Sequence, residues 1–80
     1  NWSVDLFPNP SSGIVNLVST NEKESLKIVI TDVSGKTVFV KQAITSNFIC
    51  TLDLKLQQGI YFVTILNESS NTQTKKLVIE

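Results

Sequence analysis

The sequence predicts an all-β domain, an immunoglobulin-like antiparallel β-sandwich of about seven strands with Greek-key connections. Short apolar runs recur about every ten residues between clusters of Gly, Asn, Ser and Asp, and no i, i+3, i+4 apolar pattern persists long enough to indicate a helix. Leu56, Gly59 and Tyr61 have the Leu-x-x-Gly-x-Tyr spacing of a tyrosine corner, in which a buried tyrosine at a strand start bonds back to upstream backbone. We therefore expect the Tyr61 hydroxyl to meet a backbone group near Leu56.

The strands are expected at residues 4–7, 14–19, 26–31, 37–43, 48–54, 60–66 and 74–79. Pro8 and Pro10 end the first of them, because each proline fixes a backbone φ angle and lacks an N–H donor. Gly13 then lets the chain turn back. Asp32 and Gly35 predict a hairpin turn, since an aspartate accepts bonds from backbone two residues on and a glycine adopts positive φ without strain.

Alternation within each strand assigns one face to the core. The core residues predicted in this way are Val15, Leu17, Leu26, Ile28, Ile30, Val38, Val40, Cys50, Leu52, Leu54, Tyr61, Val63 and Ile65. The opposite face carries a second apolar set, which consists of Val29, Phe39, Ile60, Phe62 and Leu66. Two explanations of this stripe stay open: loops, the last strand or a neighbouring domain cover it, or it is a docking surface.

Composition excludes several classes of function. The chain is expected to form one domain, residues 1–80, whose 41% hydrophobic content suffices for a core, and it has no apolar run long enough to span a membrane. Seven lysines balance seven acidic residues and arginine is absent, so the basic field of a nucleic-acid binder is missing. Histidine, the commonest general base and metal ligand, is also absent. The carboxylates are scattered among turns and strand edges, so we expect no enzyme, no metal and no cofactor.

Two further positions carry expectations. Cys50 is the only cysteine, so it cannot form an internal disulfide, and its alternation with Phe48 and Leu52 predicts a small core side chain. Residues 1–3 are expected to be a junction with a preceding domain, because the chain has neither a start methionine nor a signal peptide. Trp2 is then a junction residue, and the alternative is that it stacks on a sugar.

Four motifs occur in order along the chain and can be read together. Phe7 precedes Pro8, Asn9 and Pro10; Asp32, Gly35 and Lys36 have the spacing Asp-x-x-Gly-Lys; Leu56, Gly59 and Tyr61 follow; and Lys75 to Ile79 form a lysine-bearing apolar strand. With this combination, residues 4–80 resemble the type A C-terminal sorting domain of type IX secretion cargo proteins of Gram-negative bacteria, also called the Por secretion system sorting domain.

The resemblance implies a function that composition does not supply. Such domains are non-catalytic signals on cargo that has reached the periplasm by an N-terminal signal peptide. The outer-membrane type IX machinery recognises the folded sandwich and moves the cargo to the cell surface or medium. A surface sortase usually cuts the domain off and joins the cargo to an anionic lipopolysaccharide. The partners implied are therefore this machinery, the sortase and an N-terminally fused cargo.

The last strand is the candidate recognition segment. Its residues are Lys75, Lys76, Leu77, Val78, Ile79 and Glu80. The lysine pair is either a receptor contact or protection of an edge strand against aggregation, since lysines deter the pairing of a further strand. Many members of the family finish with a basic residue, whereas this chain finishes with Glu80.

Two other classes of protein stay open on the residues alone. An immunoglobulin-like or fibronectin-like spacer or adhesion module would share the sandwich and the tyrosine corner. A carbohydrate-binding module would need exposed aromatic residues in a planar row, for which the chain offers Trp2 and a few phenylalanines.

Overall fold

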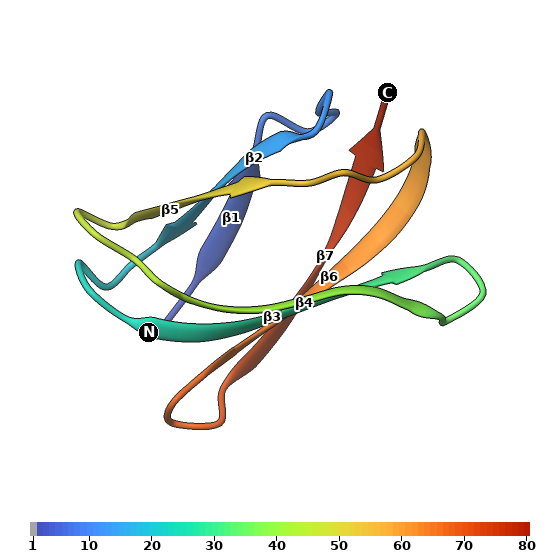
Figure 1. Ribbon diagram of the computed structural model, residues 1–80. Helices are drawn as coiled ribbons and strands as arrows, with labels where there is room; N and C mark the ends of the chain where they lie inside the picture. Colours follow the sequence, from blue (N-terminus) through green and yellow to red (C-terminus); the bar gives the residue numbers. More distant parts are fainter. Residues whose placement is uncertain (1) are drawn as a thin grey trace.

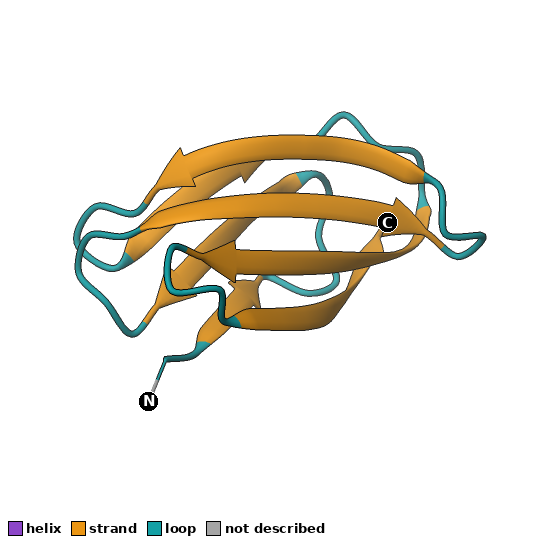
Figure 2. Cartoon of the chain, turned by 90° about the horizontal axis from the view of Figure 1, so that it is seen from below, coloured by secondary structure: helices purple, strands orange, loops and turns teal. Residues whose placement is uncertain are grey.

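The computed structural model describes residues 2–80 and contains seven strands in two antiparallel sheets. The strands are β1 (Val4–Phe7), β2 (Ile14–Ser19), β3 (Ser25–Asp32), β4 (Thr37–Ile44), β5 (Ile49–Asp53), β6 (Gly59–Asn67) and β7 (Thr72–Ile79). One sheet has the order β1-β2-β5 and the other has the order β4-β3-β6-β7. Figure 1 shows the two sheets as separate layers, and Figure 2 shows the described chain built from strands and loops. The predicted all-β sandwich is confirmed.

The core fills the space between the two sheets. Its buried hydrophobic residues are Val4, Val15, Leu17, Leu26, Ile28, Ile30, Leu52, Leu54, Tyr61, Val63, Ile65, Leu77 and Ile79. They come from every strand except β4, whose residues lie at the outer edge of the larger sheet. Period-two alternation in the other strands therefore identifies the inward face correctly.

The face assigned to β4 is wrong from Phe39 onward, because a β-bulge interrupts its pairing with β3. Ile30 pairs with Phe39 and Thr31 pairs with Thr37, so Val38 is an extra residue without a partner. Such an extra residue moves the following side chains to the other face of the strand. Phe39 accordingly packs against the core together with Val38, whereas Val40, which we expected inside, is 55% exposed.

The start of β5 also differs from the expected strand, residues 48–54. Phe48 has a positive φ of 73° and lies in the turn before β5. Its N–H donates to the carbonyl oxygen of Glu22 at 2.9 Å, and its side chain is 46% exposed. Phe48 is therefore not an inward strand residue, although Leu52 is fully buried as expected.

The outward face of the larger sheet carries an apolar stripe. Ile60 and Phe62 of β6 are exposed, and Val29 of β3 and Leu66 of β6 are half-buried on this face. Phe39, which was expected here, is absent from the stripe because of the bulge, and Val40 takes its place beside Val29. Across residues 2–80, we find no helix with the length and apolar character needed to cross a membrane.

Candidate functional site

The last strand presents its predicted recognition residues on two faces. Leu77 and Ile79 are buried in the core at 0% and 3% exposure, so a receptor cannot contact their side chains while the domain is folded. Lys76 and Glu80 are exposed, and Val78 is half-buried on the outward side. The outward set is accessible to a partner of the folded protein, and Lys75, whose side chain is 35% exposed, is partly accessible.

Neighbours on β6 complete a patch around the outward residues of β7. Lys76 lies opposite Phe62 and Val78 lies opposite Ile60 in the antiparallel register. Side chains of directly opposed residues in antiparallel strands are close enough to form one surface. We call these four residues the β6–β7 patch. It joins one lysine to three apolar side chains.

The two adjacent lysines have different surroundings. Lys75 lies on the inward side of β7, and its Nζ is 3.5 Å from Oδ1 of Asp5 on β1. This ion pair connects the last strand to the first strand across the two sheets, at the rim of the sandwich. Lys76 points outward and is exposed. The structure therefore separates two lysines that the sequence groups together.

Asn9 binds the outer edge of β7 with both ends of its side-chain amide. Its Nδ2 donates to the carbonyl oxygen of Lys76 at 2.7 Å, and its Oδ1 accepts from the N–H of Val78 at 3.0 Å. Asn9 lies between Pro8 and Pro10, which restrict the backbone on both sides. In Figure 1 this loop, between β1 and β2, lies beside the end of β7.

Ser11 continues the same contact through its backbone. Its N–H donates to the carbonyl oxygen of Val78 at 2.8 Å, and its own carbonyl oxygen accepts from the N–H of Glu80 at 2.8 Å. The Ser11 hydroxyl donates to the carbonyl oxygen of Ile14 at 2.8 Å and accepts from the N–H of Gly13 at 3.0 Å, so it orders the loop. We call the segment from Pro8 to Ser11 the edge clamp.

Pro8, Asn9 and Pro10 are recognisable in the sequence as a motif, but the clamp is not. The partners of Asn9 are 67 and 69 residues away along the chain, and a turn motif gives no indication of so distant a strand. One local signal was available. An amide side chain held between two residues that lack N–H donors is well placed to bind elsewhere.

The Asp32 motif forms a turn that uses its own carboxylate. Oδ1 of Asp32 accepts from the Ser34 hydroxyl at 2.6 Å, the Ser34 N–H at 2.9 Å and the Lys36 N–H at 3.0 Å. The bond from the Ser34 hydroxyl, followed by that from Lys36, lowers the pKa of the Asp32 carboxyl. Gly35 adopts a φ of +90° in this turn. The motif therefore shapes the hairpin between β3 and β4.

The predicted tyrosine corner is present. Tyr61 is 8% exposed, and its hydroxyl donates to the carbonyl oxygen of Gln57 at 2.7 Å. The acceptor lies one residue after Leu56, which itself packs against the core.

Cys50 packs against the core as well but is only half-buried, and this burial raises the pKa of its thiol.

Trp2 and Glu24 form a hydrogen-bonded cluster at the start of the domain. Glu24 Oε1 accepts from the Trp2 indole N–H at 2.7 Å and from the Ser19 hydroxyl at 2.8 Å, and Oε2 accepts from Asn21 at 3.0 Å. Partial burial raises the pKa of the Glu24 carboxyl, but these hydrogen bonds outweigh burial and lower it overall. Trp2, expected to be a junction residue, packs against the core, and Asn1 lies outside the described residues.

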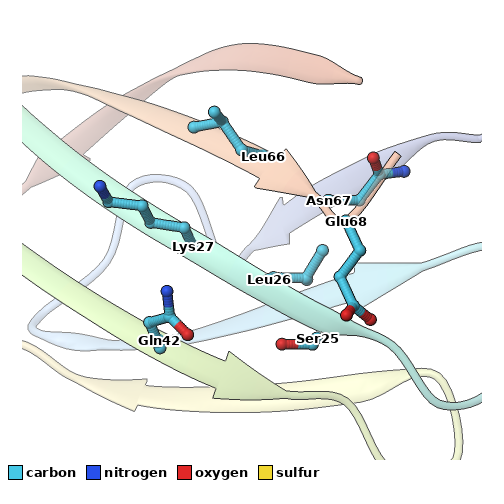
Figure 3. A pocket seen from close by; sticks show the side chains of 7 residues that line it. All are labelled: Ser25, Leu26, Lys27, Gln42, Leu66, Asn67 and Glu68. Atoms are coloured by element: carbon cyan, nitrogen blue, oxygen red, sulfur yellow. The ribbon is translucent and has the colours of Figure 1, made fainter. Parts of the chain in front are cut away.

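A shallow hollow of about 330 Å³ lies on the outward face of the larger sheet. Ser25, Leu26, Lys27, Gln42, Leu66, Asn67 and Glu68 line it. Figure 3 shows the side chains of Lys27 and Glu68 extending away from each other. Within residues 2–80, no group of three or more His, Cys, Asp or Glu residues gathers where it could hold a metal ion.

Comparisons with known proteins decide the family. A model of the secretion system C-terminal sorting domain matches residues 5–80. The chain belongs to this family. Among solved structures, an immunoglobulin-like β-sandwich protein of the DUF3244 family from Bacteroides vulgatus superposes with a TM-score of 0.70 over 100% of this chain and 95% of the other, at 17% identity. This likeness concerns the fold alone. A search of curated proteins found no match.

The sorting domain family explains the order of motifs noted above. The match starts at Asp5 and includes the edge clamp, the Asp32 turn, the tyrosine corner and β7. A member acts as a type IX sorting signal, a role that is non-catalytic and leads to export to the cell surface or the extracellular space. The fold begins slightly earlier than the match, because Ser3 also bonds to the domain. Its carbonyl oxygen accepts from the N–H of Thr20 at 3.0 Å.

Proposed function

We propose that this sorting domain carries an N-terminally fused cargo from the periplasm through the outer membrane by the type IX machinery, and that a surface sortase then removes the domain. The family match over residues 5–80 is the observation that carries the proposal. The domain acts as the substrate of the machinery and of the sortase. Released cargo reaches the medium, and cargo joined to lipopolysaccharide stays at the cell surface.

The chemistry of the domain supports a role as substrate. The carboxylate of Asp32 accepts three hydrogen bonds within its own turn, and that of Glu24 is shared among three donors. Tyr61 donates its hydroxyl proton to a backbone carbonyl. These groups maintain the fold, and the exposed side chains of the last strand are among those that a partner can reach.

The β6–β7 patch is the proposed recognition surface. Its lysine is exposed, and Ile60 and Phe62 are 43% and 38% exposed. Interfaces between proteins combine apolar contacts at their centre with polar groups at the rim, and Lys76 supplies the polar group here. The partner is a surface of the secretion machinery that offers an apolar site with a carboxylate beside it.

The sortase is proposed to cut before Trp2. From Trp2 onward the backbone is tied to the sandwich: the Ser3 N–H donates to the Thr20 hydroxyl at 3.1 Å, and the Val4 N–H donates to the Gln73 side chain at 3.1 Å. Proteases require a flexible, exposed segment, so bonds within this part of the chain are protected. The mass of the domain released at the cell surface tests this: a fragment that starts at or before Trp2 is expected, and one that starts at Ser3 or later would contradict the proposal.

The export function is tested by fusing residues 1–80 behind a passenger enzyme that has a periplasmic signal peptide. In a host with an intact type IX system, the passenger should be found at the cell surface or in the medium. The matched control is the same passenger without residues 1–80, which should stay in the periplasm. Equal retention of both passengers would reject the sorting function in favour of a spacer or adhesion module.

A further inference from the structure

Two side-chain amides bind strand edges on the same side of the sandwich. Asn9 joins the edge of β7 through Lys76 and Val78, as described above. Gln73 of β7 joins the edge of β1 in the same manner: its Oε1 accepts from the N–H of Val4 at 3.1 Å, and its Nε2 donates to the carbonyl oxygen of Trp2 at 3.3 Å. The two amides thus connect the outer strands of the two sheets.

The edge clamp differs from the Gln73 contact in what it holds. Asn9 and Ser11 together occupy four backbone groups at the end of the last strand, namely the carbonyl oxygen of Lys76, both groups of Val78 and the N–H of Glu80. β7 has β6 on its other side, so this part of β7 is hydrogen-bonded along both edges. Gln73 instead holds the beginning of β1, away from the β6–β7 patch.

We propose that Asn9 is a positioning residue of the sorting signal, which holds the end of β7 so that Lys76 and Val78 are presented to the secretion machinery in a fixed arrangement. The inference rests on the proposed export function. Asn9 acts through β7 and does not contact the receptor. Pre-ordering of a binding segment raises affinity, because the segment need not be ordered at the moment of binding.

The hydrogen bonds of Asn9 and Ser11 along the outer edge of β7 also determine how the machinery binds. A partner strand could add to β7 beside Lys76 and Val78 only by displacing Asn9 and Ser11, since their hydrogen bonds use the same backbone groups. Recognition through the outward side chains requires no such displacement. If the machinery binds the outward side chains, loss of the Asn9 amide should weaken export, because the end of β7 is no longer held. If the machinery instead adds a strand to β7, the same loss should strengthen export, because the edge becomes free.

The test compares Asn9→Ala with Gln73→Ala in the passenger fusion described above. Each substitution removes an amide that makes two side-chain hydrogen bonds to backbone groups in or next to a strand. Export should fall by about fivefold or more in Asn9→Ala and stay near the unsubstituted level in Gln73→Ala, with similar changes in melting temperature. Hydrogen exchange at the Val78 amide should accelerate by about fivefold or more in Asn9→Ala only, because one hydrogen bond is worth roughly that factor.

Each outcome bears on the proposal. Equal export by the two variants, or increased export by Asn9→Ala, would overturn it. If Asn9→Ala does not fold, Asn9→Asp serves instead, since it keeps an acceptor for the Val78 N–H and loses the donor to the Lys76 carbonyl oxygen. Unreduced export by a folded Asn9→Asp variant would also overturn the proposal. Failure of the unsubstituted fusion to export would instead reject the export function itself.

Discussion

The hydroxyl of Tyr61 donates to the carbonyl oxygen of Gln57 at 2.7 Å. This bond ties the start of β6 to the connection that precedes it, and it satisfies a phenol whose side chain is 8% exposed. A buried hydroxyl without a partner is costly, so the geometry of this connection and the burial of the tyrosine ring depend on each other.

Tyr61→Phe should reduce the free energy of unfolding by about 1 kcal/mol, because the ring stays packed while the hydrogen bond is lost and the Gln57 carbonyl loses its partner. For a domain of this size, the melting temperature should fall by roughly 4–8 °C. Thermal and urea unfolding of the two proteins measure the difference. An unchanged melting temperature would show that the corner contributes nothing to stability.

Glu24 should make the domain sensitive to acid. Its pKa is lowered in the folded state, so its carboxylate contributes stability at pH values above the unfolded pKa of about 4.3, and this contribution is lost as the pH falls through the folded pKa. Urea unfolding between pH 7 and pH 3 should show a loss that is smaller in Glu24→Gln. Glu22→Gln, the same change at an exposed position two residues away, is the charge-matched control. An identical pH profile for Glu24→Gln would contradict the assignment.

Gly13→Ala should destabilise the domain more than Gly35→Ala. Both glycines have positive φ angles, 133° and 90°, which strain any other residue. A Cβ added at Gly13 would also lie 3.1 Å from the carbonyl oxygen of Leu54, whereas a Cβ added at Gly35 would have no heavy atom within 4 Å. We expect a cost of about 1 kcal/mol at Gly35 and more at Gly13, measured by urea unfolding. A larger destabilisation by Gly35→Ala than by Gly13→Ala would indicate that the loop between β1 and β2 can shift to accommodate the added Cβ.

Lys76→Gln and Lys75→Gln should separate recognition from edge protection. Lys76 is exposed in the β6–β7 patch, whereas Lys75 pairs with Asp5 at 3.5 Å. Both substitutions should change stability by less than about 1 kcal/mol, because the charges are at least partly solvated. Export should fall for Lys76→Gln and continue for Lys75→Gln. Undiminished export by both variants would show that the lysines do not bind the receptor and serve only to protect the edge strand against aggregation.

Local patterns in the sequence were sufficient for most of the fold. β1 and β2 begin and end where alternation and the two prolines indicate, and the tyrosine corner follows from the spacing of Leu56, Gly59 and Tyr61. These features depend on residues that are neighbours in the chain. The fold class could be predicted for the same reason, since repeated short strands with intervening turns favour a sandwich.

The errors arise where distant residues decide the structure. The bulge at Val38 depends on the pairing between β3 and β4, and it reverses the faces of Phe39 and Val40. The contacts of Asn9 with β7 and of Trp2 with Glu24 join segments that only the folded sandwich brings together. Periodicity and turn chemistry are local signals, so they do not reveal such partners.

The most direct test of the central claim is the fraction of a passenger carrying residues 1–80 that becomes accessible to protease on intact cells. It is measured in two hosts, one with a complete type IX system and one without its outer-membrane component, together with a thermal melt of the fused domain. We expect the passenger to be accessible in the first host and protected in the second. Protection in both hosts, with a folded domain, would contradict the claim that this sandwich is a sorting signal.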